Sequence, residues 1–360
     1  MKWSWKIGSV AGIDIYVHGT FAILLAWIAL SHARAGAALP EIVGDMAFVV
    51  LVFAIVVLHE LGHALMARRF GVRTKDITLL PIGGLARLEK LPEEPRHELL
   101  IALAGPAVNV ALAVLLIVVT VPLAQMSSIS DAATAGGNFL AKLFWVNVVL
   151  AAFNLIPAFP MDGGRVLRAL LSMGTDRVRA TEIAAAVGQV FAVLIGLVGA
   201  LVNPFLVLIA LFVWLGAAGE ARAVRITSSL AGVRVARVMI TEFCALAPAE
   251  SLADAIRHVL AGFQHDFPVV EGGKVLGMLT RQGLLRALAQ FGTDLPVRSA
   301  MNPNVQVVQA TEMVEQAYAR LQEIDCRSMP VVYEGRLVGI VTLENVAEFL
   351  MFASATQRSG

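Results

Sequence analysis

The sequence predicts a multi-pass α-helical membrane protein with six transmembrane helices, followed by a soluble α/β region. Composition is the first observation behind this fold class. Of 360 residues, 58% are hydrophobic and only 15% are charged, whereas charged residues make up about a quarter of a soluble globular domain. Long apolar runs occupy the first part of the chain, and an internal repeat occupies the last part.

Six segments of roughly 20 residues are apolar enough to cross a bilayer. They lie near residues 15–31, 46–66, 99–124, 139–157, 183–201 and 203–221. Lys and Arg gather after the second and fourth segments and at both ends of this region, while the alternate loops hold very few. Because basic loops stay on the cytoplasmic side, the pattern places both termini in the cytoplasm of a cell-membrane protein.

Charge and cysteine content exclude two further classes of protein. The formal net charge of +1 argues against nucleic-acid binding, which requires a strongly basic surface. The two cysteines, Cys244 and Cys326, suggest neither a disulfide framework nor a thiolate metal site.

The region after about residue 223 contains a tandem repeat. Pro268–Thr280 aligns with Pro330–Thr342 at an offset of 62 residues. Each copy predicts a strand, a turn at glycine, a second strand and a helix. We therefore expect four parts, namely a membrane domain 1–222, a linker 223–235, and two repeat domains 236–290 and 298–352.

The motif His59-Glu60-Leu61-Gly62-His63 ends the apolar run of the second predicted span. Two histidines four residues apart lie on one face of a helix, so their nitrogens can bind one zinc ion, with the glutamate as general base. Titratable groups are costly in a membrane and therefore indicate function. The motif predicts a zinc-activated water and Glu60 as the base that takes its proton.

Asp162 is the candidate for a third metal ligand. Catalytic zinc usually has three protein ligands and a water, and Asp162 follows two prolines that interrupt the fourth predicted span. Irregular backbone at membrane depth needs protein or a water-filled cavity around it. The alternative is that Asp162 only caps a helix beginning near Arg165. Asn154 is the predicted amide that stabilises the oxyanion of the reaction, and Asn109 and Asn147 are further amides that could hold water or orient ligands.

A second feature could bind a protein substrate, if the predicted zinc site hydrolyses peptide bonds. Residues 77–87 predict a strand, a turn at Gly83-Gly84 and a second strand. A peptide bond inside a helix is shielded, so an intramembrane protease must unwind its substrate. The edge of a strand could then capture the unwound segment through main-chain hydrogen bonds.

Together these motifs resemble the site-2 protease family of intramembrane zinc metalloproteases. The matching segments are His59–His63, Pro81–Gly84, Gly105–Asn109 and Asn154–Gly164. The resemblance implies one zinc ion per chain, bound by His59, His63 and Asp162, with Glu60 as base. It also implies cleavage of membrane-anchored proteins in regulated intramembrane proteolysis.

The C-terminal repeat looks like a pair of cystathionine-β-synthase-type (CBS) domains, which one branch of that family carries. Such pairs bind adenine nucleotides and regulate the attached protein, so Thr280 and Thr342 are candidate nucleotide contacts. Many nucleotide-binding copies have an aspartate three residues after the threonine, and here those positions are Gly283 and Asn345. The resemblance also implies a homodimer formed through the CBS domains.

The sequence as a whole therefore predicts an intramembrane zinc endopeptidase with a regulatory CBS pair. The alternative is a membrane transporter or channel that is gated by the CBS pair and contains a structural metal site. Inverted repeats or charged residues along several spans would favour that alternative, but the ionisable groups of the predicted spans converge on one place.

Overall fold

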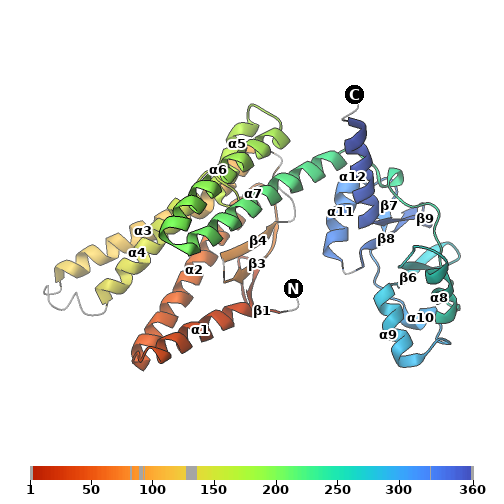
Figure 1. The fold of residues 1–360 in the computed structure, drawn as a ribbon, viewed down its shortest axis with the longest axis horizontal. Helices are drawn as coiled ribbons and strands as arrows, with labels where there is room; N and C mark the ends of the chain where they lie inside the picture. The colour runs from red at the N-terminus through yellow and green to blue at the C-terminus, as the bar shows by residue number, and fades with distance from the viewer. Residues whose placement is uncertain are drawn as a thin grey trace. The chain divides into compact units, whose positions relative to one another are not determined.

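The computed structural model describes residues 3–81, 83–88, 92, 94–126, 136–324 and 326–357. The chain divides into two compact units, Met1–Val224 and Arg225–Gly360. Long helices and one small sheet form the first unit, and short strands and helices form the second (Figure 1).

The first unit is mainly helical. Its helices are α1 Thr20–Arg34, α2 Leu39–Arg69, α3 Pro95–Met126, α4 Gly136–Asn154, α5 Asp162–Ser172, α6 Arg177–Val202 and α7 Pro204–Leu230, the last of which extends into the second unit. Among the described residues, α2, α3, α6 and α7 are long and apolar enough to cross a membrane. The apolar parts of α1 and α4 are shorter. Four of the six predicted spans therefore meet the length needed, and the count of six stays a prediction.

A four-stranded sheet accompanies these helices. Its strands are β1 Ser4–Val10, β2 Ile13–His18, β3 Thr74–Leu80 and β4 Gly83–Leu88, in the order β1-β2-β3-β4. Strands β2 and β3 pair in parallel, and the other pairs are antiparallel. The first predicted span was wrong at its start, because residues 15–18 belong to β2, whose alternate residues Ile13 and Ile15 are buried.

The predicted strand-turn-strand over residues 77–87 is present as β3 and β4. Gly83 adopts φ +139°, a conformation that side chains disfavour, and so allows the turn between them. Ile13 of β2 and Ile77 of β3 pack against Leu61 and Ala64 of α2 in one apolar cluster. This packing fixes the sheet against the helix that carries the histidine motif.

The loop between α4 and α5 is enclosed by α6 and α7. Phe159 packs with Ala184 and Ala185 of α6 and with Ala217 of α7. Small residues allow the close approach, since a Cβ added to Gly216 of α7 would lie 2.8 Å from the Pro160 Cδ atom. The loop that precedes Asp162 is therefore held by helices distant in sequence.

The second unit contains the two predicted repeats. Its elements are η1 Val235–Arg237, α8 Leu252–Ala261, β5 Phe267–Glu271, β6 Lys274–Leu279, α9 Arg281–Phe291, α10 Val297–Ala300, β7 Val308–Gln309, α11 Val314–Glu323, β8 Ser328–Tyr333, β9 Arg336–Thr342 and α12 Leu343–Gln357. The predicted order of strand, turn, strand and helix appears as β5-β6-α9 and again as β8-β9-α12. Each repeat has its own apolar core.

The two repeats exchange short segments. The backbone of Ile240, near the start of the first repeat, pairs with Ile340 of β9, and Asn302, near the start of the second, pairs with Met278 of β6. Gly277 and Gly339 precede these strand residues, and an added Cβ at Gly277 would lie 2.7 Å from the Asn302 carbonyl oxygen. The glycine in each copy of the repeat therefore leaves room for the segment from the other copy.

We predict opposite effects for two glycine substitutions in α7. Gly216→Ala should lower the free energy of unfolding by about 1 to 3 kcal/mol, because the new methyl group overlaps Pro160. Gly219→Ala should be neutral or stabilising by up to about 1 kcal/mol, because nothing lies within 4 Å of its added Cβ and alanine favours the helix. Thermal unfolding in detergent measures both, and equal effects would contradict the packing described.

Candidate metal centre

The two histidines of the motif lie on the buried face of α2. His59 and His63 are 6% and 5% exposed, and their Nε2 atoms are 3.1 Å apart. One helical turn separates them, which places one imidazole above the other on the same side of the helix. Two nitrogen ligands therefore converge on one point beside α3.

Asp162 reaches the same point from another helix. It is the first residue of α5, and its Oδ2 atom lies 3.1 Å from the Nε2 atom of each histidine. The helix cap is Met161, which makes no side-chain hydrogen bond. The capping alternative is thus not favoured, because the carboxylate faces the imidazoles. Within the described part of the chain, this trio is the one group of three or more His, Cys, Asp or Glu side chains with metal-binding spacing.

Glycines in the first turn of α5 make this geometry accessible. A Cβ added to Gly163 would lie 2.2 Å from the Ile156 carbonyl oxygen, and one added to Gly164 would lie 2.6 Å from the Phe159 nitrogen. Any larger residue at either position would push the turn away from α5. The Asp-Gly-Gly sequence is therefore needed for the backbone to bring the carboxylate to α2.

The hydrogen bonds of the imidazoles suit a bound cation. His63 Nδ1 lies 2.7 Å from the Ile101 carbonyl oxygen, which can only accept, so this nitrogen carries the proton. In the neutral ring the Nε2 atom then offers a lone pair. His59 Nδ1 lies 2.8 Å from Asn109 Oδ1 and has the same arrangement. Two lone pairs and a carboxylate oxygen therefore face one another, and a divalent cation would remove their repulsion.

The spacing of the three atoms fits zinc. Ligand atoms about 2.0 to 2.1 Å from a tetrahedral zinc ion lie roughly 3.3 Å from one another, close to the 3.1 Å separations found here. Two imidazoles and one carboxylate form a common ligand set for catalytic zinc. The residues present therefore fit the ion that the sequence predicts.

Helix α3 passes directly beside the trio at Gly105. A Cβ added there would lie 2.2 Å from His63 Nε2 and 2.7 Å from His59 Nε2. Sequence analysis identified the Gly105–Asn109 segment only through its resemblance to a family motif. The structure explains the first and last residues of this segment. Gly105 leaves space beside the trio, and Asn109, which is fully buried, contacts His59.

Glu60, next to His59 in the sequence, lies against the edge of the sheet. Its side chain is half-buried, and a Cβ added to Gly84 of β4 would lie 2.6 Å from Glu60 Cγ and 3.1 Å from Oε1. Because β4 ends the sheet order, the candidate base lies next to an edge strand. Gly84 therefore permits the close approach of β4 to Glu60.

The predicted amides have different surroundings. Asn109 contacts His59, as expected of a group that orients a ligand. Asn147 is buried, and its Nδ2 atom donates to the Leu143 carbonyl within its own helix. Asn154 is the last residue of α4 and is half-buried, and its predicted role toward the oxyanion stays a prediction.

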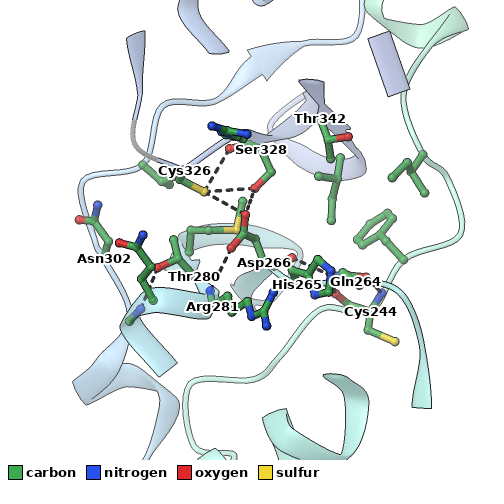
Figure 2. A pocket seen from close by; sticks show the side chains of 18 of the residues that line it. Cys244, Gln264, His265, Asp266, Thr280, Arg281, Asn302, Cys326, Ser328 and Thr342 are labelled. Carbon is green, nitrogen blue, oxygen red and sulfur yellow. Dashed lines mark hydrogen bonds between the residues drawn. The ribbon is translucent and has the colours of Figure 1, made fainter. Parts of the chain in front are cut away.

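A second site lies between the two repeats of the second unit. Figure 2 shows this cavity of about 1650 Å³, with Asp266 and Ser328 at its centre. Ser328 Oγ donates to Asp266 Oδ2 at 2.7 Å, and these residues occupy equivalent positions in the two repeats. Burial raises the pKa of the neighbouring Cys326 thiol, which therefore stays protonated at neutral pH.

The predicted nucleotide contacts, Thr280 and Thr342, both line this cavity. Each hydroxyl also has a partner within the chain. Thr280 caps α9 by accepting from the Gly283 backbone nitrogen at 3.0 Å, and Thr342 donates to Asn345 Oδ1 at 2.7 Å. The two residues that replace the aspartates of many nucleotide-binding copies are therefore partners of these threonines.

Models of known families match segments in both parts of the chain. The model of peptidase family M50 matches residues 47–136 and 121–198, and the CBS-domain model matches residues 235–290 and 297–351. A zinc metalloprotease of Methanocaldococcus jannaschii is 34% identical over 348 residues, which cover 96% of each chain.

Solved structures were also compared. The site-2 protease of Methanocaldococcus jannaschii is 37% identical, with a TM-score of 0.46 over 61% of this chain and 95% of that chain. The CBS-pair protein CBSX2 from Arabidopsis thaliana is 24% identical, with a TM-score of 0.32 over 34% of this chain and 98% of that one. On the sequence matches above, the chain belongs to peptidase family M50, the site-2 proteases, as a membrane metalloprotease with tandem CBS domains.

Proposed function

We propose that the chain is an intramembrane zinc endopeptidase that cleaves membrane-anchored proteins in regulated intramembrane proteolysis. The observation that carries this proposal is the convergence of two imidazole nitrogens and one carboxylate oxygen within 3.1 Å of one another. The helix that carries both histidines, α2, is apolar and long enough to cross a membrane. Membership of family M50 favours this function over a transporter or channel gated by the CBS pair.

The proposed chemistry assigns a role to each polar group of the site. Zinc, when bound by His59, His63 and Asp162, polarises the substrate carbonyl and makes water more acidic. Glu60 accepts a proton from the attacking water and delivers it to the leaving amine. The Asn154 amide donates a hydrogen bond to the oxygen of the tetrahedral intermediate.

Strand β4 is the proposed binding surface for an unwound substrate. It forms one edge of the sheet, so an extended peptide could add to it through main-chain hydrogen bonds. Gly84 brings this edge against Glu60. A peptide paired with β4 would therefore present its main chain close to the base.

We further propose the organisation that the sequence predicted. The membrane domain 1–222 has six spans with both termini in the cytoplasm, since its basic residues would then lie on one side. A linker, 223–235, leads to CBS domains 236–290 and 298–352, which regulate the protease and form a homodimer.

The cavity of the CBS pair is the proposed site for an adenine nucleotide. Its two repeat-equivalent helices carry opposite charges into the lining, because α9 contributes Arg281 and Arg286 and α12 contributes Glu344 and Glu348. Guanidinium groups bind phosphate strongly, whereas carboxylates repel it. The phosphate group would therefore bind on the arginine side.

Glu60→Gln should abolish proteolysis while leaving one zinc ion per chain. Glutamine keeps the shape of the side chain but cannot accept the proton, and it is not a proposed ligand. Zinc content of the purified protein and cleavage of a membrane-anchored reporter are measured together. Cleavage at the wild-type rate would refute the assignment of Glu60.

Asp162→Asn should lower zinc affinity by at least tenfold, because the charged ligand is replaced by a neutral amide. Chelator competition with the purified protein measures the affinity. Asn147→Ala is the control, since that amide hydrogen-bonds within α4 and should leave zinc binding unchanged. Equal zinc affinities for Asp162→Asn and the wild type would remove Asp162 from the ligand set.

AMP should bind to the full-length protein at one site per chain, and Arg286→Gln should weaken this binding about tenfold, the loss expected for one charge-assisted hydrogen bond. Isothermal titration with AMP gives both values. Glu348→Gln, on the equivalent helix, should not weaken binding. Unchanged affinity in Arg286→Gln would contradict the proposed orientation.

A further inference from the structure

The buried guanidinium of Arg168 connects three helices of the membrane domain. Arg168 is fully buried, although sequence analysis counted it with the basic residues that set orientation. Its Nε atom donates to Glu98 Oε1 of α3 at 2.7 Å, and its Nη1 atom donates to Glu220 Oε1 of α7 at 2.6 Å. A charge buried inside a protein is retained only when it is paired. Arg168 on α5 therefore depends on partners from both neighbouring helices.

Arg168 also contacts the loop that carries the proposed metal ligand. It lies six residues after Asp162 on the same helix, and its guanidinium lies 5.1 Å from the centre of the Phe159 ring. Phe159 is itself 1% exposed and lies three residues before Asp162. The position of the guanidinium is thus coupled to both sides of the turn at Asp162.

One face of α7 packs against Arg168 and the loop that precedes Asp162. Gly216 approaches Pro160, Ala217 packs with Phe159, and Glu220 pairs with Arg168. Residues 216 and 220 are one helical turn apart and so lie on the same face. A shift or rotation of α7 would move all three contacts together.

We propose that α7 positions the metal ligand Asp162 through the Glu220–Arg168 ion pair and so slows the release of zinc. The inference rests on the proposed zinc site. Glu220 and Arg168 are positioning residues, since they act on the ligand through the α5 turn.

The test of this proposal removes the charge from Glu220. Glu220→Gln should speed zinc release into excess chelator about tenfold, the change typical of groups that orient ligands. It should also lower kcat on a membrane-anchored reporter without changing KM, because the proposed substrate edge β4 is untouched. Arg222→Gln, which removes an exposed charge from the same helix, is the control and should match the wild type.

The outcomes separate this inference from the proposed function. Zinc release from Glu220→Gln at the wild-type rate overturns the positioning role. If the wild-type protein itself binds no zinc, the proposed function fails and the inference fails with it.

Discussion

Three lone-pair donors brought together in an apolar interior are the constraint on which the first unit depends. The imidazoles of His59 and His63 and the carboxylate of Asp162 lie mutually 3.1 Å apart, a costly arrangement unless a cation joins them. Neighbouring groups hold the three side chains in this arrangement. The Ile101 carbonyl and Asn109 fix the orientation of the rings, and Gly105 provides the space beside them.

In both units, glycines allow segments of backbone to approach neighbouring residues closely. Gly84 allows an edge strand to approach Glu60, Gly163 allows the preceding loop to pack against the start of α5, and Gly277 leaves room for a segment from the other repeat. In each case an added Cβ would overlap a neighbouring atom. The glycines therefore specify which segments may touch, and so shape both the metal centre and the CBS pair.

Local sequence patterns were sufficient to predict part of this architecture. The histidine motif, the broken helix at Asp162, the hairpin at residues 77–87 and the repeat all carry signals within a few residues, and each has its counterpart in the structure. The start of the first span was misassigned, because alternating apolar residues of β2 merge with α1. Arg168 was missed because its partners, Glu98 and Glu220, lie far away in sequence.

X-ray absorption at the zinc edge of the purified full-length protein tests the central claim most directly. The account predicts one zinc ion per chain, coordinated by two imidazoles and otherwise by oxygen. Asp162→Asn should change the oxygen shell and leave both imidazoles in place in whatever zinc is retained. A sulfur ligand, or fewer than two imidazoles in the wild-type protein, would contradict the site described.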